Sequence, residues 1–176
     1  MRYVEVRRHT LRQRPGEHVT QAGVELARRV GNRMGPFARV VTSKAPRAFE
    51  TAIAMGFAVD EQDERLSKMG EDVDAEITWP ASFAEYARVI RQGGATARFA
   101  RAQAEVWRSL ARELRDGEQA LVVTHGGIVE IGAIGCLPNA DHAAWGNFCD
   151  LCEGVRLSFD GKDFVEQEIM RVDPKG

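Results

Sequence analysis

Side chains with catalytic potential follow three short apolar segments of the sequence. Arg8 and His9 come at the end of a Val- and Tyr-rich segment near the N-terminus. Arg47 lies shortly after a second apolar segment, and His125 ends a third, QALVVTH. An imidazole can act as a nucleophile or a proton carrier, and planar guanidinium groups bind phosphate oxygens in pairs. Two histidines and two arginines in one place would therefore bind a phosphate group.

The three apolar segments are expected to be β-strands that bring these side chains together. Residues 2–8 alternate between apolar and polar, residues 38–43 are short and apolar, and residues 119–125 are continuously apolar before the histidine. In open α/β sheets, ligands bind at the carboxyl ends of the strands. The polar side chains should therefore converge there, where Gly126 and Gly127 would let the backbone approach a ligand closely.

Helical patterns separate the strands. Thr20 can cap a helix that runs to about residue 33, and Pro46 is well placed in the first turn of a second helix. Apolar residues recur at helical spacing over residues 81–92 and, most clearly, over residues 96–115. The segment GGIVEIGAIG begins a further helix after the third strand. Each strand is thus followed by a helix that can cover the sheet.

The order of the elements predicts an α/β fold. Residues 154–160 and 163–170 are two more strands around the turn DGKD, which is typical of a hairpin. We expect a three-layer α/β/α sandwich with a mainly parallel sheet and helices on both faces. Residues 58–75 are acidic, lack core periodicity and are expected to be irregular. Without a linker, repeat or low-complexity tract, residues 1–176 are expected to form a single domain.

Composition and charge argue against several classes of protein. The 176 residues are 44% hydrophobic and 28% charged, with a formal net charge of −2, so nothing attracts the whole chain to nucleic acid or membrane. Without a signal peptide or a membrane-spanning apolar run, a cytoplasmic location is expected. Cys149 and Cys152 form a CxxC, CDLC, without the partners that would complete a zinc site. We therefore expect structural thiols and no metal site.

Four segments resemble a known family. RRHT, HVTQAGVELA, TSKAPRAFETA and VVTHGG look like the signature segments of the histidine phosphatase superfamily, also called the phosphoglycerate mutase-like superfamily. They occur in the family's order between residue 4 and about residue 135. Each motif is weak alone, but all four in order are specific. The resemblance is to small phosphatases of the mutase-like branch, and it implies the phosphoglycerate mutase-like fold.

The resemblance implies a role for each polar side chain. His9 would attack phosphorus and form a phosphohistidine, and it must be neutral to do so. Arg8 and Arg47 would hold the non-bridging oxygens, and His125 would complete the pocket as a cation or a hydrogen-bond donor. Because the arginines supply the positive charge, no metal ion or other cofactor is needed.

Further residues of the motifs are expected to bind substrate. Thr10 stands where the family usually has glycine, and Gly126 follows the late histidine. Pro15 stands where the family often has asparagine, so Arg14 or Arg12 would take over phosphate contacts.

The general acid is the main departure from the family pattern. Lys68 occupies the place of the glutamate in the Leu-x-Glu segment of mutase-like members. Glu71 is our preferred candidate for protonating the leaving group, and Asp72 and Glu64 stay open as alternatives. Without such an acid, only esters with good leaving groups would turn over.

Two functions from different classes remain in competition. The first is a metal-independent phosphohydrolase of the histidine acid phosphatase type, acting on a small phosphorylated substrate through phosphohistidine. A phosphoglycerate mutase is less favoured, since the chain is short and the acid is displaced. The second is a catalytically weak or inactive module that binds a phosphorylated ligand. A metal-binding or redox protein using CDLC comes a distant third. The oligomeric state is left open.

Overall fold

A six-stranded sheet forms the centre of the molecule, for which the computed structural model describes residues 1–173. The strand order is β3-β2-β4-β1-β5-β6. The strands are β1 (Arg2–Arg8), β2 (Arg39–Thr42), β3 (Glu61–Gln62), β4 (Gln119–Thr124), β5 (Gly154–Phe159) and β6 (Phe164–Met170). The first four in this order pair in parallel, whereas β5 runs antiparallel to both β1 and β6. The predictions of a mainly parallel sheet and a C-terminal hairpin are confirmed.

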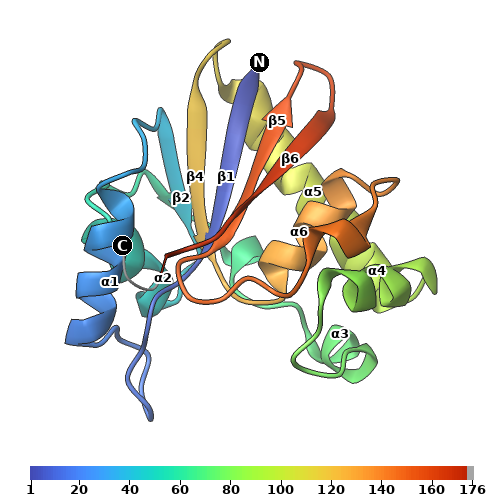
Figure 1. Ribbon diagram of the computed structural model, residues 1–176, viewed down its shortest axis with the longest axis horizontal. Coiled ribbons are helices and arrows are strands. Elements are labelled where there is room, and N and C mark those ends of the chain that lie inside the picture. The colour runs from blue at the N-terminus through green and yellow to red at the C-terminus, as the bar shows by residue number, and fades with distance from the viewer. Residues whose placement is uncertain (174–176) are drawn as a thin grey trace.

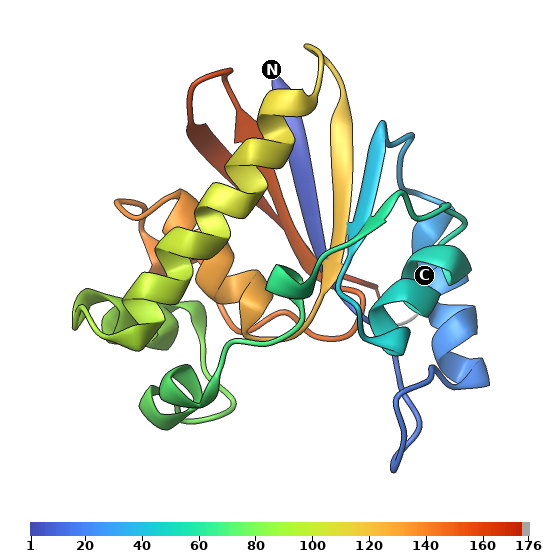
Figure 2. The ribbon, with the colours of Figure 1, turned by 180° about the vertical axis from the view of Figure 1, so that it is seen from behind.

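Helices cover both faces of this sheet (Figures 1 and 2). Those described are α1 (Gln21–Gly31), α2 (Pro46–Ala54), α3 (Glu71–Glu76), α4 (Phe83–Arg91), α5 (Ala95–Glu113) and α6 (Ile128–Cys136). Of two 3₁₀ turns, η1 (Glu64–Leu66) lies between α2 and α3, and η2 (His142–Trp145) lies between α6 and β5. Within residues 1–173, no helix is long and apolar enough to cross a membrane.

Alternation along β4 shows how the two helical layers divide the core. Leu121 and Val123 pack in one cluster with Ala48 of α2. Val122 belongs to the opposite, larger cluster, which contains Trp107 of α5 and the apolar residues of α6. Successive side chains of a strand point to opposite faces, so β4 is buried on both sides. The three-layer sandwich expected from the sequence is confirmed.

Local signals place the first two helices where the sequence predicts them. Thr20 caps α1, because its Oγ1 accepts the Gly23 N–H at 3.0 Å. Pro46 occupies the first turn of α2, where a backbone N–H would have no partner within the helix, so its missing N–H costs no hydrogen bond. These two helices follow β1 and β2, and their starts are therefore fixed beside the carboxyl ends of those strands.

The segment expected to be irregular, residues 58–75, is partly regular, and that prediction is wrong. It contains β3, η1 and most of α3. These elements have two, three and six residues, and α3 buries only Val73, so none is long enough to show a period in the sequence.

Candidate active site

Three neighbouring strands bring the candidate side chains to one place. His9 follows β1 and His125 follows β4, two strands paired in parallel, and the centroids of the two imidazole rings lie 5.3 Å apart. Arg47 reaches the same place from the first turn of α2, after β2. Together with Arg8 these residues line a cavity of about 510 Å³. The convergence expected at the carboxyl ends of the strands is therefore present in the structure.

His9 is held in one tautomer. Its Nδ1 lies 2.7 Å from the carbonyl oxygen of Thr10, which can only accept, so Nδ1 carries the proton and Nε2 keeps its lone pair. Burial, together with the charges of Arg47 and Arg8, lowers the pKa of His9 to about 4 against the opposing effect of the Thr10 hydrogen bond. Above about pH 5 His9 is therefore a neutral imidazole with a free electron pair.

His125 is also neutral, yet it can still donate a hydrogen bond. Burial, followed by the nearby His9 and Arg47, lowers the pKa of His125 to about 3. Its Nε2 lies 2.7 Å from Ser43 Oγ, which accepts the Ala45 N–H at 3.3 Å and can give its own proton to the ring. When the Ser43 hydroxyl donates to Nε2 in this way, the single N–H of the neutral ring is on Nδ1, and among the described residues this buried atom has no partner. With its proton on Nδ1, the neutral His125 ring can donate a hydrogen bond.

Four arginines line the cavity: Arg8, Arg12, Arg14 and Arg47. The buried Nε atoms of Arg8 and Arg47 have no hydrogen-bond partner within residues 1–173. Burial, and then the charge of Arg12, lowers the pKa of Arg47 below its usual value. A buried guanidinium N–H without an acceptor raises the free energy of the folded protein. An anion bound between the arginines removes this penalty because its oxygens accept the hydrogen bonds. The neighbouring Arg7 takes no part, because it forms a buried ion pair with Glu5 at 2.7 Å.

Arg8 is held against the backbone by its surroundings. Its NH1 donates to the carbonyl of Cys149 at 3.1 Å, and Asp150 lies 4.0 Å away. A Cβ on Gly126 would come within 3.1 Å of Arg8 Nε, so the absence of a side chain at Gly126 makes room for the guanidinium stem.

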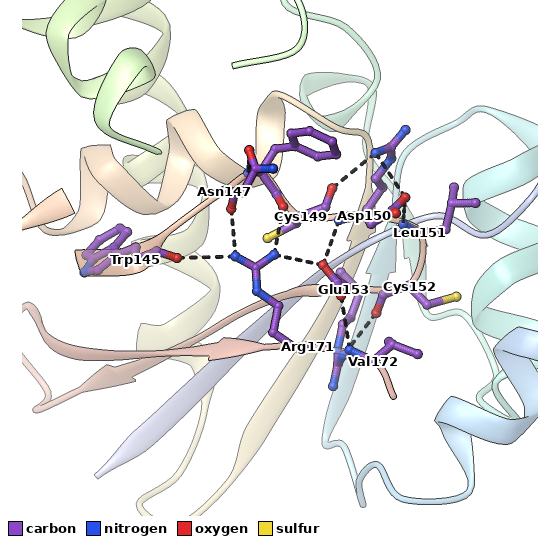
Figure 3. A network of polar contacts seen from close by, with 12 residues as sticks. Trp145, Asn147, Cys149, Asp150, Leu151, Cys152, Glu153, Arg171 and Val172 are labelled. Carbon is purple, nitrogen blue, oxygen red and sulfur yellow. Dashed lines mark hydrogen bonds and ion pairs between the residues drawn. The ribbon is translucent and has the colours of Figure 1, made fainter. Parts of the chain in front are cut away.

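The segment that holds Arg8 is itself fastened by Arg171 (Figure 3). Arg171 Nη1 donates to the Phe148 carbonyl at 2.7 Å and pairs with Glu153 at 2.9 Å, and its Nη2 donates to the carbonyls of Asn147 and Trp145. One guanidinium thus orders the chain between η2 and β5, which includes Phe148 in the cavity wall.

Of the remaining expected binding residues, Arg14 and Gly126 line the cavity and Thr10 does not. Thr10 is fully buried, and its hydroxyl donates to the Gly23 carbonyl at 2.9 Å. Its N–H donates to Thr51 Oγ1. The side chain therefore ties β1 to α1, and Thr10 serves the site through the carbonyl that orients His9.

None of the three expected acids lines the cavity. Glu71 and Asp72 are exposed at the start of α3, and Glu64 is exposed in η1. Lys68, at the family's usual acid position, is exposed as well.

Sequence reasoning missed the other wall of the cavity, which contains Trp79, Pro80, Tyr86, Phe148 and Glu130. Trp79 is 43% exposed and meets Tyr86 edge to face, with ring centroids 5.8 Å apart. Glu130 had one signal in the sequence: it stands three residues after Gly127, the spacing at which a glutamate accepts the N–H at the start of a helix. The rest come from distant segments that no local pattern connects.

The cysteines are separate from this chemistry. Cys136, Cys149 and Cys152 are free and buried, and burial raises the pKa of all three thiols. Among residues 1–173, no cluster of three or more His, Cys, Asp or Glu side chains is placed to hold a metal ion.

Comparison with known proteins assigns the family. The model of the histidine phosphatase superfamily (branch 1) matches residues 4–170. The chain therefore belongs to this superfamily, as its four motifs predict, and superfamily members are phosphatases and mutases. A search of curated proteins returned no match.

Solved structures share the fold at low sequence identity. Phosphoserine phosphatase of Entamoeba histolytica, in complex with 3-phosphoglyceric acid, has a TM-score of 0.71 and 14% identity over 98% of each chain. Phosphoglycerate mutase of Bacillus anthracis str. Sterne has a TM-score of 0.66 and 18% identity, over 93% of this chain and 90% of that one. A mycobacterial glucosyl-3-phosphoglycerate phosphatase, in complex with VO3, has a TM-score of 0.65 and 19% identity, over 98% of this chain and 100% of that one.

Proposed function

We propose that this chain hydrolyses small phosphomonoesters without a metal ion, through a phosphohistidine formed on His9. The observation that carries the proposal is the state of His9: a neutral ring, oriented through Nδ1 by the Thr10 carbonyl, in a cavity lined by arginines. A nucleophile with a free electron pair and a positively charged binding site are the two requirements for phosphoryl transfer to an imidazole.

In the first step, His9 Nε2 attacks phosphorus, the P–N bond forms and the ester P–O bond breaks. The guanidinium groups of Arg8 and Arg47 hold the non-bridging oxygens, and the His125 Nδ1–H donates to one of them. In the second step, the oxygen of a water molecule attacks phosphorus and the P–N bond breaks. Phosphate leaves and His9 returns to its neutral form.

The size and lining of the cavity support a small substrate. The volume of about 510 Å³ has room for a phosphoryl group and a compact leaving group. Related folds have been solved with phosphoserine and with 3-phosphoglyceric acid, both small phosphomonoesters. Arg12 and Arg14 lie at one side, where they could meet a second anionic group of the substrate.

The test is turnover of p-nitrophenyl phosphate with EDTA across pH 5–8, with His9→Ala measured beside the wild type. We expect turnover that resists the chelator and vanishes in His9→Ala, and a phosphoprotein that is stable in base and labile in acid. His18→Ala is the matched control, because His18 is an exposed histidine outside the cavity. Activity of His9→Ala above about a tenth of wild type would exclude His9 as the nucleophile.

One observation favours the alternative of a binding module: Glu71, Asp72 and Glu64 are all outside the cavity. If the protein binds phosphate or vanadate, but turns over no ester at any pH, the non-catalytic alternative replaces our proposal.

A further inference from the structure

A buried carboxyl group in the cavity wall has no place in the mechanism above. Glu130, in the first turn of α6, is 1% exposed and lines the cavity with Arg8 and His9. Its Oε2 accepts the Gly127 N–H at 2.8 Å. The Tyr86 hydroxyl and the backbone of Cys149 also lower the pKa of Glu130 as hydrogen-bonding neighbours, although the buried Oε1 makes no hydrogen bond of ordinary geometry within the described chain. A buried carboxyl oxygen without a well-formed hydrogen bond can exchange a proton with a ligand in the cavity.

The groups that face Glu130 come from three elements: Arg8 at the end of β1, Tyr86 of α4, and Cys149 before β5. Burial raises the pKa of Glu130 to about 7, although the Gly127 N–H and the charge of Arg8 oppose this shift. Burial also raises the pKa of Tyr86 and of Cys149, so both are neutral. The carboxyl group can therefore be protonated at mildly acidic pH and ionised slightly above neutrality.

We propose that Glu130 is the acid and base of the reaction, in place of the glutamate that the loop after α2 lacks. The proposal rests on the proposed function and assigns its missing proton donor. In the first step, Glu130 gives its proton to the leaving oxygen as the ester P–O bond breaks and the P–N bond to His9 forms. In the second step, the Glu130 carboxylate takes a proton from the attacking water, whose oxygen bonds to phosphorus as the P–N bond breaks. Ester and water become alcohol and phosphate, and Glu130 ends protonated.

The position of Glu130 suits this role better than that of the acids expected from the sequence. Glu130 lies in the first turn of α6, five residues after His125, whose ring is beside that of His9. Glu71 is exposed in α3 and does not line the cavity. The chemically distinct possibility is a positioning role, in which an ionised Glu130 would orient the guanidinium of Arg8. A proton donor and a positioning carboxylate differ in how the rate depends on the leaving group and on pH.

The experiment compares Glu130→Gln with wild type on phenyl phosphate, a poor leaving group, and 2,4-dinitrophenyl phosphate, a good one. Glutamine keeps an acceptor for the Gly127 N–H but cannot give up a proton. We expect kcat/KM to fall about 100-fold or more on phenyl phosphate and about tenfold or less on the dinitrophenyl ester. The decline of wild-type kcat/KM on phenyl phosphate above about pH 7, where Glu130 ionises, should be absent from the variant.

Three further variants complete the experiment. Glu166→Gln, on the exposed side of β6, is the matched control and should match wild type on both esters. Glu130→Asp keeps a carboxyl group and should restore part of the phenyl phosphate activity, which gives a second reading if the glutamine variant folds poorly. Glu71→Gln tests the acid expected from the sequence, and we expect it to lack the leaving-group effect.

Each contrary result has a defined meaning. Equal loss on both esters in Glu130→Gln, with a raised KM, would assign a positioning role and overturn the proposal. The leaving-group effect in Glu71→Gln instead would overturn it in favour of Glu71. In both cases a phosphohistidine on His9 would still form. Failure of the wild type to form phosphohistidine would refute the proposed function, and with it the role of Glu130.

Discussion

The two buried histidines should make the stability of the protein depend on pH in a way that single variants can isolate. The pKa of His9 is about 4 and that of His125 about 3 in the folded protein, against about 6.5 for an unfolded histidine. Between these values the unfolded chain binds more protons than the folded one. Stability is therefore fully present above about pH 6.5 and is lost as the pH falls toward 4.

The size of the effect follows from the same values. Between pH 7.5 and pH 5, each histidine should lower the free energy of unfolding by about 2 kcal/mol, and the two together by about 4 kcal/mol. Glu130 acts in the opposite direction, because its pKa is raised and the folded state holds its proton more tightly. Its contribution is shared by wild type and variants, so it cancels when their pH dependences are subtracted.

The assay is urea unfolding at pH 7.5 and pH 5 in one phosphate-free buffer mixture, with wild type, His9→Ala, His125→Ala and the control His18→Ala. From pH 7.5 to pH 5, the free energy of unfolding of each active-site variant should fall by about 2 kcal/mol less than that of wild type. His18→Ala should show the same fall as wild type. Removal of His9 also removes its contribution to the lowered pKa of His125. At pH 5, however, the amount by which His125 lowers the free energy of unfolding hardly depends on that contribution. If all four proteins lose the same stability, the histidines are not desolvated as we describe and the reasoning fails.

Two more predictions concern the cavity wall. Trp79→Ala should raise KM severalfold for p-nitrophenyl phosphate and much less for an alkyl phosphate. The reason is that Trp79 is the exposed aromatic surface beside the arginines, where an aromatic leaving group can pack. Equal effects on both esters would contradict a contact between Trp79 and the leaving group. Gly126→Ala would place a Cβ about 3.1 Å from Arg8 Nε and displace the guanidinium, so kcat/KM should fall about tenfold or more with little change in the thermal midpoint. Steady-state kinetics and thermal unfolding check both, and unchanged kcat/KM in Gly126→Ala would show that Arg8 tolerates the shift.

A single domain over residues 1–176, a cytoplasmic location and the acid phosphatase subtype stay predictions. The role of His9 is a proposal that His9→Ala tests, and the roles of Arg8, Arg47 and His125 are proposals as well.

Local patterns in the sequence were sufficient for the fold class and for half of the cavity. Alternation and helical spacing depend only on neighbours a few residues apart, which is why β1, β4 and α5 were predicted close to their observed bounds. His9 and His125 could be paired in advance because the carboxyl ends of parallel strands must meet at one edge of the sheet.

Only the tertiary structure decided the other half of the cavity. Trp79, Tyr86, Phe148 and Glu130 come from four separate segments, and packing over the sheet brings them to the cavity that the arginines also line. Glu130 shows the reason most clearly: an acidic side chain in the first turn of a helix is ordinarily a solvated cap, and its raised pKa comes from burial under α4 and the segment before β5. Desolvation depends on everything that surrounds a group in space, and a sequence lists only what precedes and follows it.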